Sequence, residues 1–322
     1  MSATMKAGIE FSTGQSDPVS GNQSLGDGFN KKDMKLNLAY FDWTLVDQDP
    51  NTVNLVGGKM KNPFICVSDL VWDGDLTPEG LAVKGQAAPL ESLTLLANGG
   101  YMWVQERSTG NDDTKLYAGQ GAVKYQPVPE FYVMVGAGYY QYDNMAGYQV
   151  LDWEGRNSGY GNSTVNGSVS GSTTNKNYKF EYQPLEIFAE LGVFVGGFPI
   201  TVYGQALSNS EADDNDSGEL YGVTFGKAKN PKTFEVGYRY AKLEKDATVG
   251  AFTDSDRLGG GTDGEGSKVH GKYQIAKNLQ AGVAYFMDTK KISDPSHETD
   301  YNRLQVDLVY NFGIVTVVLT DG

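Results

Sequence analysis

The sequence predicts an all-β fold, a transmembrane antiparallel up-and-down β-barrel with about fourteen strands. Apolar and polar residues alternate over long segments, as in strands with two unlike faces. Short and long connections alternate along the chain, as expected for a barrel with tight turns at one rim and large loops at the other. No run of about 18–20 apolar residues occurs, so a bundle of membrane-spanning helices is excluded.

The clearest strand is the segment 304–312. Its even-numbered positions are all apolar, whereas its odd-numbered positions include Gln305, Asp307 and Asn311. A period of two places these two sets on opposite faces of a strand, and helical spacing cannot produce it. The same pattern predicts strands near residues 4–13, 33–45, 52–60, 79–88, 92–106, 114–126, 130–143, 177–196, 200–208, 218–228, 232–245, 267–276, 278–288 and 301–312.

The lengths of these segments also favour a membrane barrel. Strands of soluble proteins average about 5–6 residues, whereas tilted membrane strands need about 9–11. The short turns are expected at 47–51, 127–129, 196–199, 229–231 and 276–278. The long loops are expected at 14–32, 62–78, 144–176, 209–217, 246–266 and 289–300.

The segment 177–196 changes face along its length. Its apolar residues occupy even positions before Gln183 and odd positions after Pro184. A β-bulge absorbs such a slip in register, and it also accommodates a proline that has no N–H to donate. We therefore expect one long strand with a bulge at Gln183-Pro184.

The composition excludes several classes of function. The chain has 322 residues and a formal net charge of −14, which opposes binding to nucleic acid through bulk charge. Its one cysteine and two histidines leave little material for a disulfide framework, a metal site or a catalytic triad. Cys66 is expected to be a buried and inert thiol. We expect no enzyme activity, no metal and no cofactor.

Two neighbouring motifs carry a resemblance to a known family. The first is Gly-Gly-Lys-Met-Lys-Asn-Pro-Phe at 57–64, and the second is the acidic segment 68–80, which contains Trp-Asp-Gly-Asp and ends in Pro-Glu-Gly. Further matches lie at 22–26, 138–140, 246–256 and 304–307. In this order they resemble the bacterial outer-membrane family called putative porins, over almost the whole chain.

The resemblance implies a barrel of sixteen strands in the bacterial outer membrane. In that comparison the chain opens at what looks like the third strand, and residues 313–322 continue beyond the terminal aromatic residue that family members tend to end on. We expect one β-barrel domain over residues 1–322, with 313–322 as an extra C-terminal segment. The expected partners are the lipid bilayer, small hydrophilic solutes and ions, and by analogy two further copies in a homotrimer.

The loop 62–78 is the best candidate for a constriction. It joins two predicted membrane strands and combines aromatic rings with carboxylates. Irregular backbone at membrane depth is stable only where it is buried in protein or lines water. We therefore expect it to fold into the mouth or lumen of the barrel; the alternative is an ordinary external loop. The constriction residues, with those adjoining the loop, are Lys61, Phe64, Asp69, Trp72, Asp73, Asp75 and Glu79.

Alternation also assigns the two faces of the wall. The residues expected to face the lumen or its rims are Lys6, Glu10, Lys35, Lys84, Lys124, Glu186, Glu190, Glu235, Arg239, Lys268, His270, Lys272, Arg303 and Asp307. Those expected to face lipid or a neighbouring protomer are Val123, Phe131, Val133, Leu191, Val236, Ile275, Val283, Leu304, Val306, Leu308 and Phe312.

These expectations favour a porin, a water-filled channel for passive diffusion of small hydrophilic solutes and ions. In the candidate constriction, carboxylates outnumber the one basic residue, Lys61. Because the electric field is focused at the narrowest section of a pore, we expect a weak preference for cations. The alternative is a soluble or surface-displayed all-β carbohydrate-binding module. Detergent-dependent extraction and conductance in a planar bilayer separate the two.

Overall fold

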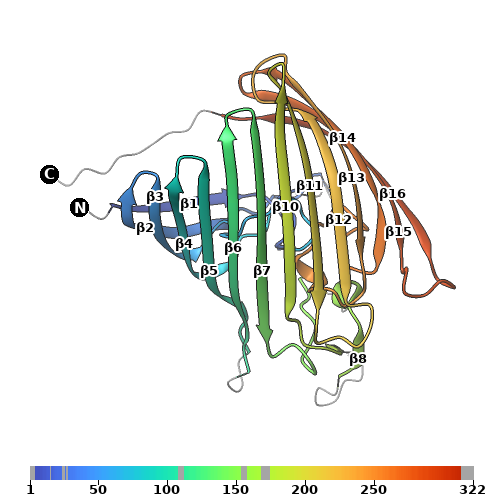
Figure 1. Cartoon of the computed structure of the whole chain (residues 1–322). Helices are drawn as coiled ribbons and strands as arrows, with labels where there is room; N and C mark the ends of the chain where they lie inside the picture. Colours follow the sequence, from blue (N-terminus) through green and yellow to red (C-terminus); the bar gives the residue numbers. More distant parts are fainter. Residues whose placement is uncertain are drawn as a thin grey trace.

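The protein is an all-β structure. The computed structural model describes residues 4–14, 16–23, 26, 28–107, 112–153, 158–167 and 175–312. Within these residues, fourteen strands form one curved antiparallel sheet in which each strand pairs with the next along the chain (Figure 1). The strands are β1 (Thr4–Ser12), β2 (Lys35–Gln48), β3 (Asn51–Lys59), β4 (Glu79–Leu90), β5 (Leu93–Gln105), β6 (Thr114–Val128), β7 (Phe131–Asp143), β10 (Pro184–Val195), β11 (Phe198–Asn209), β12 (Ser217–Gly226), β13 (Phe234–Leu243), β14 (Gly264–Ala276), β15 (Leu279–Lys290) and β16 (Thr299–Tyr310).

The connections sort to the two ends of the sheet, as the sequence predicts. Two-residue turns join β2 to β3, β4 to β5, β6 to β7, β10 to β11 and β14 to β15. At the same end, β12 is joined to β13 by residues 227–233, a connection as long as 210–216 at the opposite end. The longer connections lie at the other end, which is the lower side in Figure 1. Among the described residues, β1 and β16 are not paired with each other, so the sheet keeps two free edges. The predicted antiparallel up-and-down order is confirmed.

The predicted strand 177–196 is wrong. The sheet strand β10 begins at Pro184, while β9 (Lys176–Tyr178) belongs to a separate pair with β8 (Thr164–Asn166). A proline at the first position of a strand loses no ladder hydrogen bond, so no bulge is needed there. The rings of Tyr178 and Tyr182 lie 5.7 Å apart and are fully buried, which removes them from the wall.

Apolar side chains lie on both sides of the sheet, for different reasons. On the outer face they are exposed, as Ile187 (60%), Leu304 (64%) and Val306 (76%) show. Inside the curve, the loops contribute a buried cluster that packs on strand residues such as Met102 and Tyr140. A row of exposed large apolar residues on strands is typical of a wall that contacts lipid. We call the face that carries the packed loops the inner face.

In the described parts of the long connections there are two short 3-10 helices. They are η1 (Gly159–Gly161), between β7 and β10, and η2 (Gly250–Phe252), between β13 and β14. Within the described residues, no helix is long and apolar enough to cross a membrane.

Candidate functional site: a loop packed on the inner face

The connection between β3 and β4, residues 60–78, folds onto the inner face; we call it loop 60–78. Its two ends are tied together, since the Met60 amide donates to the Pro78 carbonyl at 2.9 Å. Lys59 Nζ donates to the Thr77 carbonyl at 2.9 Å and lies 3.4 Å from Glu79 Oε1. This closed neck fixes the direction in which the loop leaves the wall.

Gln120 on β6 holds the tip of the loop. Its Oε1 accepts from the Ile65 amide at 2.7 Å, and its Nε2 donates to the Ile65 carbonyl at 2.9 Å. One side-chain amide thus satisfies both backbone groups of one loop residue, as a neighbouring strand would. Beside this anchor, the rings of Phe64 and Trp72 pack edge-on against Tyr140 of β7, with centroids 5.4 and 5.2 Å from it.

A buried polar network supports the anchor from the wall. Tyr140 Oη donates to Glu186 Oε2 at 2.6 Å, and Gln205 Nε2 donates to Glu186 Oε1 at 2.7 Å. Glu186 is 1% exposed. Gly138 leaves room for this contact, because a Cβ at that position would lie 2.6 Å from Tyr140 Oη. The network joins β7, β10 and β11 under the loop.

Arg239 of β13 joins two loops to the wall. Its guanidinium forms ion pairs with Asp69 of loop 60–78 and, at 2.7 Å, with Asp254 of the β13–β14 connection. Arg239 is only 5% exposed. Burial would raise the pKa of Asp254, but the charges of Arg239 and Lys268 outweigh it and lower that pKa. Arg239 therefore acts as a buried bridge, with little of its charge exposed to the interior.

Asp73 makes a second contact between the same two loops. Its amide donates to the Phe252 carbonyl at 2.9 Å, and its carboxylate accepts from the amides of Asp75 and Ser255 at 2.7 and 2.9 Å. Burial raises the pKa of Asp73 to about 7, with further raising by Asp254 and Asp75, against lowering by the two amide hydrogen bonds. The group therefore titrates near neutral pH.

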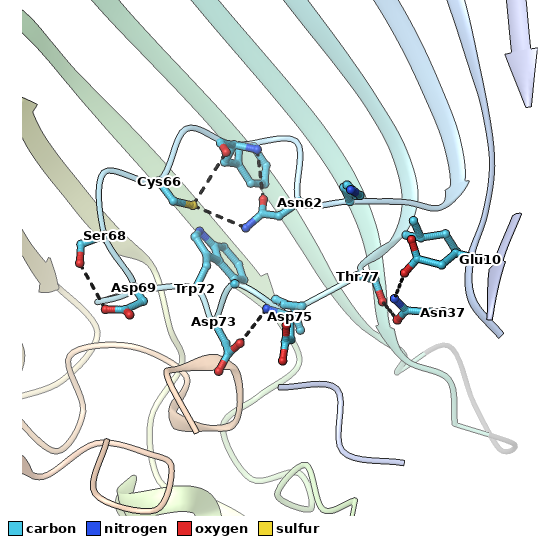
Figure 2. A pocket seen from close by; sticks show the side chains of 15 residues that line it. Glu10, Asn37, Asn62, Cys66, Ser68, Asp69, Trp72, Asp73, Asp75 and Thr77 are labelled. Carbon is cyan, nitrogen blue, oxygen red and sulfur yellow. Dashed lines mark hydrogen bonds between the residues drawn. The ribbon is translucent and has the colours of Figure 1, made fainter. Parts of the chain in front are cut away.

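Cys66 differs from its sequence expectation, because its thiol is exposed rather than buried. Ile65, the residue before it, is anchored to Gln120, and the side chain of Cys66 lines the cavity that Figure 2 shows beside loop 60–78. Desolvation by the surrounding protein atoms, with the Glu186 carboxylate second, raises the pKa of the thiol to about 12. The expectation of low reactivity stays a prediction.

Three cavities border the loop. The largest, about 650 Å³, lies between the loop and β1–β2 and is lined by Glu10, Asp73, Asp75 and Lys61 among others (Figure 2). A second of about 420 Å³ lies towards β3–β5 and contains Asp42 and Lys84. The third, of about 310 Å³, lies towards β13–β16 and brings together Asp69, Arg239, Lys268, His270, Lys272 and Asp307.

The residues expected to face the lumen lie on the inner face, as their strand register and side-chain contacts show. Lys6 lies opposite Asp42 in the β1–β2 register. Lys124 lies over the Tyr132 ring, and Tyr132 Oη donates to Glu190 at 2.7 Å. Glu235 Oε1 lies 3.3 Å from Lys272 and 3.5 Å from His270. At the long-loop end, Lys35 lies 3.7 Å from Asp33 and Arg303 lies 3.0 Å from Asp256.

The residues expected on the lipid side are exposed or half-buried on the outer face. Exposure ranges from 37% for Leu191 to 85% for Phe312 among those with large exposure. Phe131 and Val133 are half-buried. Residues 313–322, expected as an extra segment, lie outside the described residues.

Sequence reasoning missed three residues that build the site. Gln120, Tyr140 and Gln205 hold the loop and Glu186, but none is charged, so alternation alone marked them only as residues of one face. The nearest signal was the match at 138–140. In the described part of the chain, no group of three or more His, Cys, Asp or Glu side chains could hold a metal ion.

Comparison with known proteins identifies the family. The family described as "Putative porin" matches residues 1–170 and 156–312. No curated protein matches the sequence. The fold is similar to that of OprB from Pseudomonas putida, with a TM-score of 0.50, 10% identity, and coverage of 85% of this chain and 72% of that one.

Two further solved structures are similar over most of their length. OmpT, an outer membrane protein of Vibrio cholerae, has a TM-score of 0.48 and 15% identity, with 86% of this chain and 80% of that one covered. The outer membrane channel DcaP of Acinetobacter baumannii has a TM-score of 0.47 and 10% identity, with 96% and 97% covered. Since the family match covers nearly the whole chain and the sheet has the matching architecture, the chain belongs to the putative porin family and is a channel-type β-barrel protein of the bacterial outer membrane.

Proposed function

We propose that the inner face and loop 60–78 form a water-filled channel for passive diffusion of small hydrophilic solutes and ions. The observation that carries the proposal is the position of the loop. It is tied to the wall through Gln120 and Arg239, and cavities with charged residues in their lining lie on both sides of it. A loop held inside a barrel narrows the cross-section available to solutes, so loop 60–78 is the proposed constriction.

In such a channel the two faces of the sheet form a pore wall and a lipid wall. The pore wall comprises the charged residues of the inner face, with Arg239 contributing structure rather than free charge. The lipid wall comprises the exposed apolar residues of the outer face. We treat the sheet and its packed loops as one β-barrel domain. Family membership favours a passive channel over both an enzyme and a soluble carbohydrate-binding module.

Weak cation preference is the finer part of the proposal. The largest cavity is lined by Glu10, Asp69, Asp73 and Asp75 against Lys61. Asp69 is neutralised by Arg239, and Asp73 is 8% exposed, so Asp75 is the loop carboxylate most available to a passing ion. Charge at the narrowest section outweighs exposed charge elsewhere, which salt screens beyond about 8–10 Å.

Planar-bilayer recordings test the channel and its selectivity together. The purified protein should give stepwise conductance, and a salt gradient should give a reversal potential on the cation side. Asp75→Asn should move the reversal potential towards anions. Asp214→Asn is the matched control, because Asp214 is an exposed carboxylate in the β11–β12 loop and should leave it unchanged.

Two results would contradict the proposal at different levels. Absence of conductance from correctly folded protein would remove the channel itself. Conductance with equal reversal potentials for Asp75→Asn and the parent would leave the channel but remove the loop as its selective constriction.

A homotrimer is the proposed assembly. One solved OmpT structure from Vibrio cholerae is described as a trimer form, which is a statement about that protein. For this chain, the support is the large exposed apolar area of the outer face. The mass of the protein–detergent complex, corrected for bound detergent, should correspond to three chains; the mass of one chain would contradict the proposal.

A further inference from the structure

The short-turn rim carries an unevenly distributed charge. The turns at 48–51, 90–93 and 128–131 contain Asp49, Glu91 and Glu130 and no basic residue. The turn between β12 and β13, residues 227–233, instead contains Lys227, Lys229 and Lys232 and no acidic residue. All three lysines are exposed, and among the described residues no carboxylate lies within 4.0 Å of their ammonium groups. One turn therefore concentrates unneutralised positive charge.

The backbone of this turn is held in a defined conformation. The Lys229 amide donates to Thr233 Oγ1 at 3.1 Å, and Thr233 Oγ1 donates to the Asn230 carbonyl at 2.6 Å. Neighbouring strands fix it from the side, since the Lys232 amide donates to the Gln274 carbonyl at 2.7 Å. Gln280 Nε2 also donates to the carbonyl of residue 228 at 2.9 Å. The three lysines therefore extend from a turn whose backbone is fixed by hydrogen bonds.

An aromatic cavity of about 390 Å³ lies directly beside the lysines. Phe194, Phe198 and Phe234 line it, together with Pro199 and the basic turn. The rings of Phe198 and Phe234 lie 5.7 Å apart, and Phe234 is 49% exposed. These residues stand at the ends of β10, β11 and β13. By alternation, Phe198 and Phe234 share the outer face with Val202 and Val236, whereas Phe194 shares a strand face with Glu186 and Glu190. The cavity thus has an apolar side towards lipid and a cationic side towards water.

We infer that this cavity binds an anionic phospholipid of the periplasmic leaflet. Short turns of outer-membrane barrels lie on the periplasmic side, so the basic turn stands at the level of phospholipid headgroups. The headgroup phosphate meets the lysines, and the start of an acyl chain lies against the phenyl rings. A soluble anion would use the lysines alone and leave the aromatic side of the cavity without a function.

The magnitude of the expected selectivity follows from the charge. A lysine near an anionic membrane surface contributes about 1 kcal/mol, which is roughly a fivefold change in affinity. Three lysines that act on one headgroup should therefore favour an anionic lipid over a zwitterionic one by more than tenfold. The inference concerns the short-turn rim and does not depend on conduction through the lumen.

Native mass spectrometry of the whole protein in detergent measures this preference. Dioleoyl phosphatidylglycerol and dioleoyl phosphatidylcholine are supplied together, and their bound ratio is compared. The parent should favour phosphatidylglycerol, and the variant K227Q/K229Q/K232Q should lower the ratio at least tenfold. The matched control K31Q/K32Q/K291Q removes three exposed lysines from the long-loop end and should leave the ratio unchanged.

Further arms identify the ligand. The variant F198A/F234A should weaken phosphatidylglycerol binding while the lysines remain, and excess glycerol 3-phosphate should fail to displace the lipid. Equal binding of the two lipids, or an unchanged ratio in the lysine variant, would overturn the inference. Displacement by glycerol 3-phosphate would make this a free-phosphate site and would also overturn it. Far-UV circular dichroism of each variant reports folding without relying on conduction, and a conducting channel without lipid preference would leave the proposed function standing.

Discussion

Asp73 couples protonation to the contact between two loops. Its pKa is raised to about 7 in the folded protein, above the ordinary value of 3.8, chiefly by burial. A carboxyl group whose pKa is raised by folding favours the folded arrangement while it is protonated. The stabilisation is therefore complete below about pH 3.8 and is lost as the pH rises through 7.

The first prediction follows from this sign. Between pH 5 and pH 8 the contact of Asp73 with the β13–β14 connection should weaken, because a desolvated carboxylate forms beside Asp254. Hydrogen exchange at the Ser255 amide, corrected for intrinsic pH dependence, should accelerate about tenfold over this range. Asp73→Asn should remove most of the pH dependence. Equal protection at both pH values in the parent would contradict the assignment.

Cys66 provides the second prediction, because it is the only cysteine in the chain. Its thiol opens into the largest cavity, yet its pKa is raised to about 12 from 9.0. The thiolate fraction at neutral pH should then be roughly a thousandfold below that of an ordinary cysteine, and the thiolate is the reactive form.

Maleimide labelling of folded protein at pH 7 should therefore be slower than labelling of the unfolded chain by orders of magnitude, and faster at pH 9. Once a bulky reagent has reacted, the conductance should fall, since the label occupies the cavity beside loop 60–78. Cys66→Ser should be insensitive to the same reagent. Rapid labelling at pH 7 would contradict the raised pKa, and labelling without a conductance change would place the thiol away from the solute path.

At the scale of elements, Arg239 links the wall to two loops. It pairs with Asp69 and Asp254 at 5% exposure. Arg239→Gln would leave two carboxylates close together without their cation, and breaking a buried ion pair in this way costs about 3–5 kcal/mol. We expect a lower thermal midpoint and noisier open-channel current, because both loops lose a tether.

Arg303→Gln is the matched comparison. Arg303 also pairs with a carboxylate of the β13–β14 connection, at 3.0 Å from Asp256, but its side chain is 36% exposed. Exposed ion pairs contribute about 0–1 kcal/mol, so this variant should change the thermal midpoint little. Equal effects of the two substitutions would show that Arg239 is not the structural bridge.

The strands could be predicted from the sequence where apolar and polar residues alternate because the two strand faces meet different surroundings. Thirteen of the expected strands match strands of the sheet to within three residues, because each has one apolar and one polar face. The exception is 177–196. Its apolar residues Tyr178 and Tyr182 do not belong to the outer face of a strand, because they pack inside the curve of the sheet. Periodicity records the presence of an apolar environment and does not distinguish lipid from packed loop.

The site was predictable only in part. The composition of 62–78 and its place between two strands indicated a loop within the barrel. The partners of its carboxylates depend on strands more than a hundred residues away, as with Asp69 and Arg239. Local sequence cannot reveal that one carboxylate is neutralised, a second is buried, and Asp75 is left exposed.

At the scale of the whole molecule, the two faces of the sheet should respond oppositely to charge. Gln305 and Val306 are neighbours near the middle of β16, so they point to opposite faces. Val306 is 76% exposed on the outer face, whereas Gln305 lines a cavity of the inner face. An arginine facing lipid at mid-height costs about 2–4 kcal/mol, while one facing water in the lumen costs little.

The last prediction uses this pair of adjacent positions. Val306→Arg should reduce the yield of protein folded into lipid vesicles and lower its stability to denaturant by about 2–4 kcal/mol. Gln305→Arg should fold normally and instead add a positive charge to the cavity towards β13–β16, moving the reversal potential towards anions. Side-chain size and chemistry are the same in both variants, so only the facing differs. Equal loss of folding in the two, or normal folding of Val306→Arg, would contradict the division into a lipid wall and a pore wall.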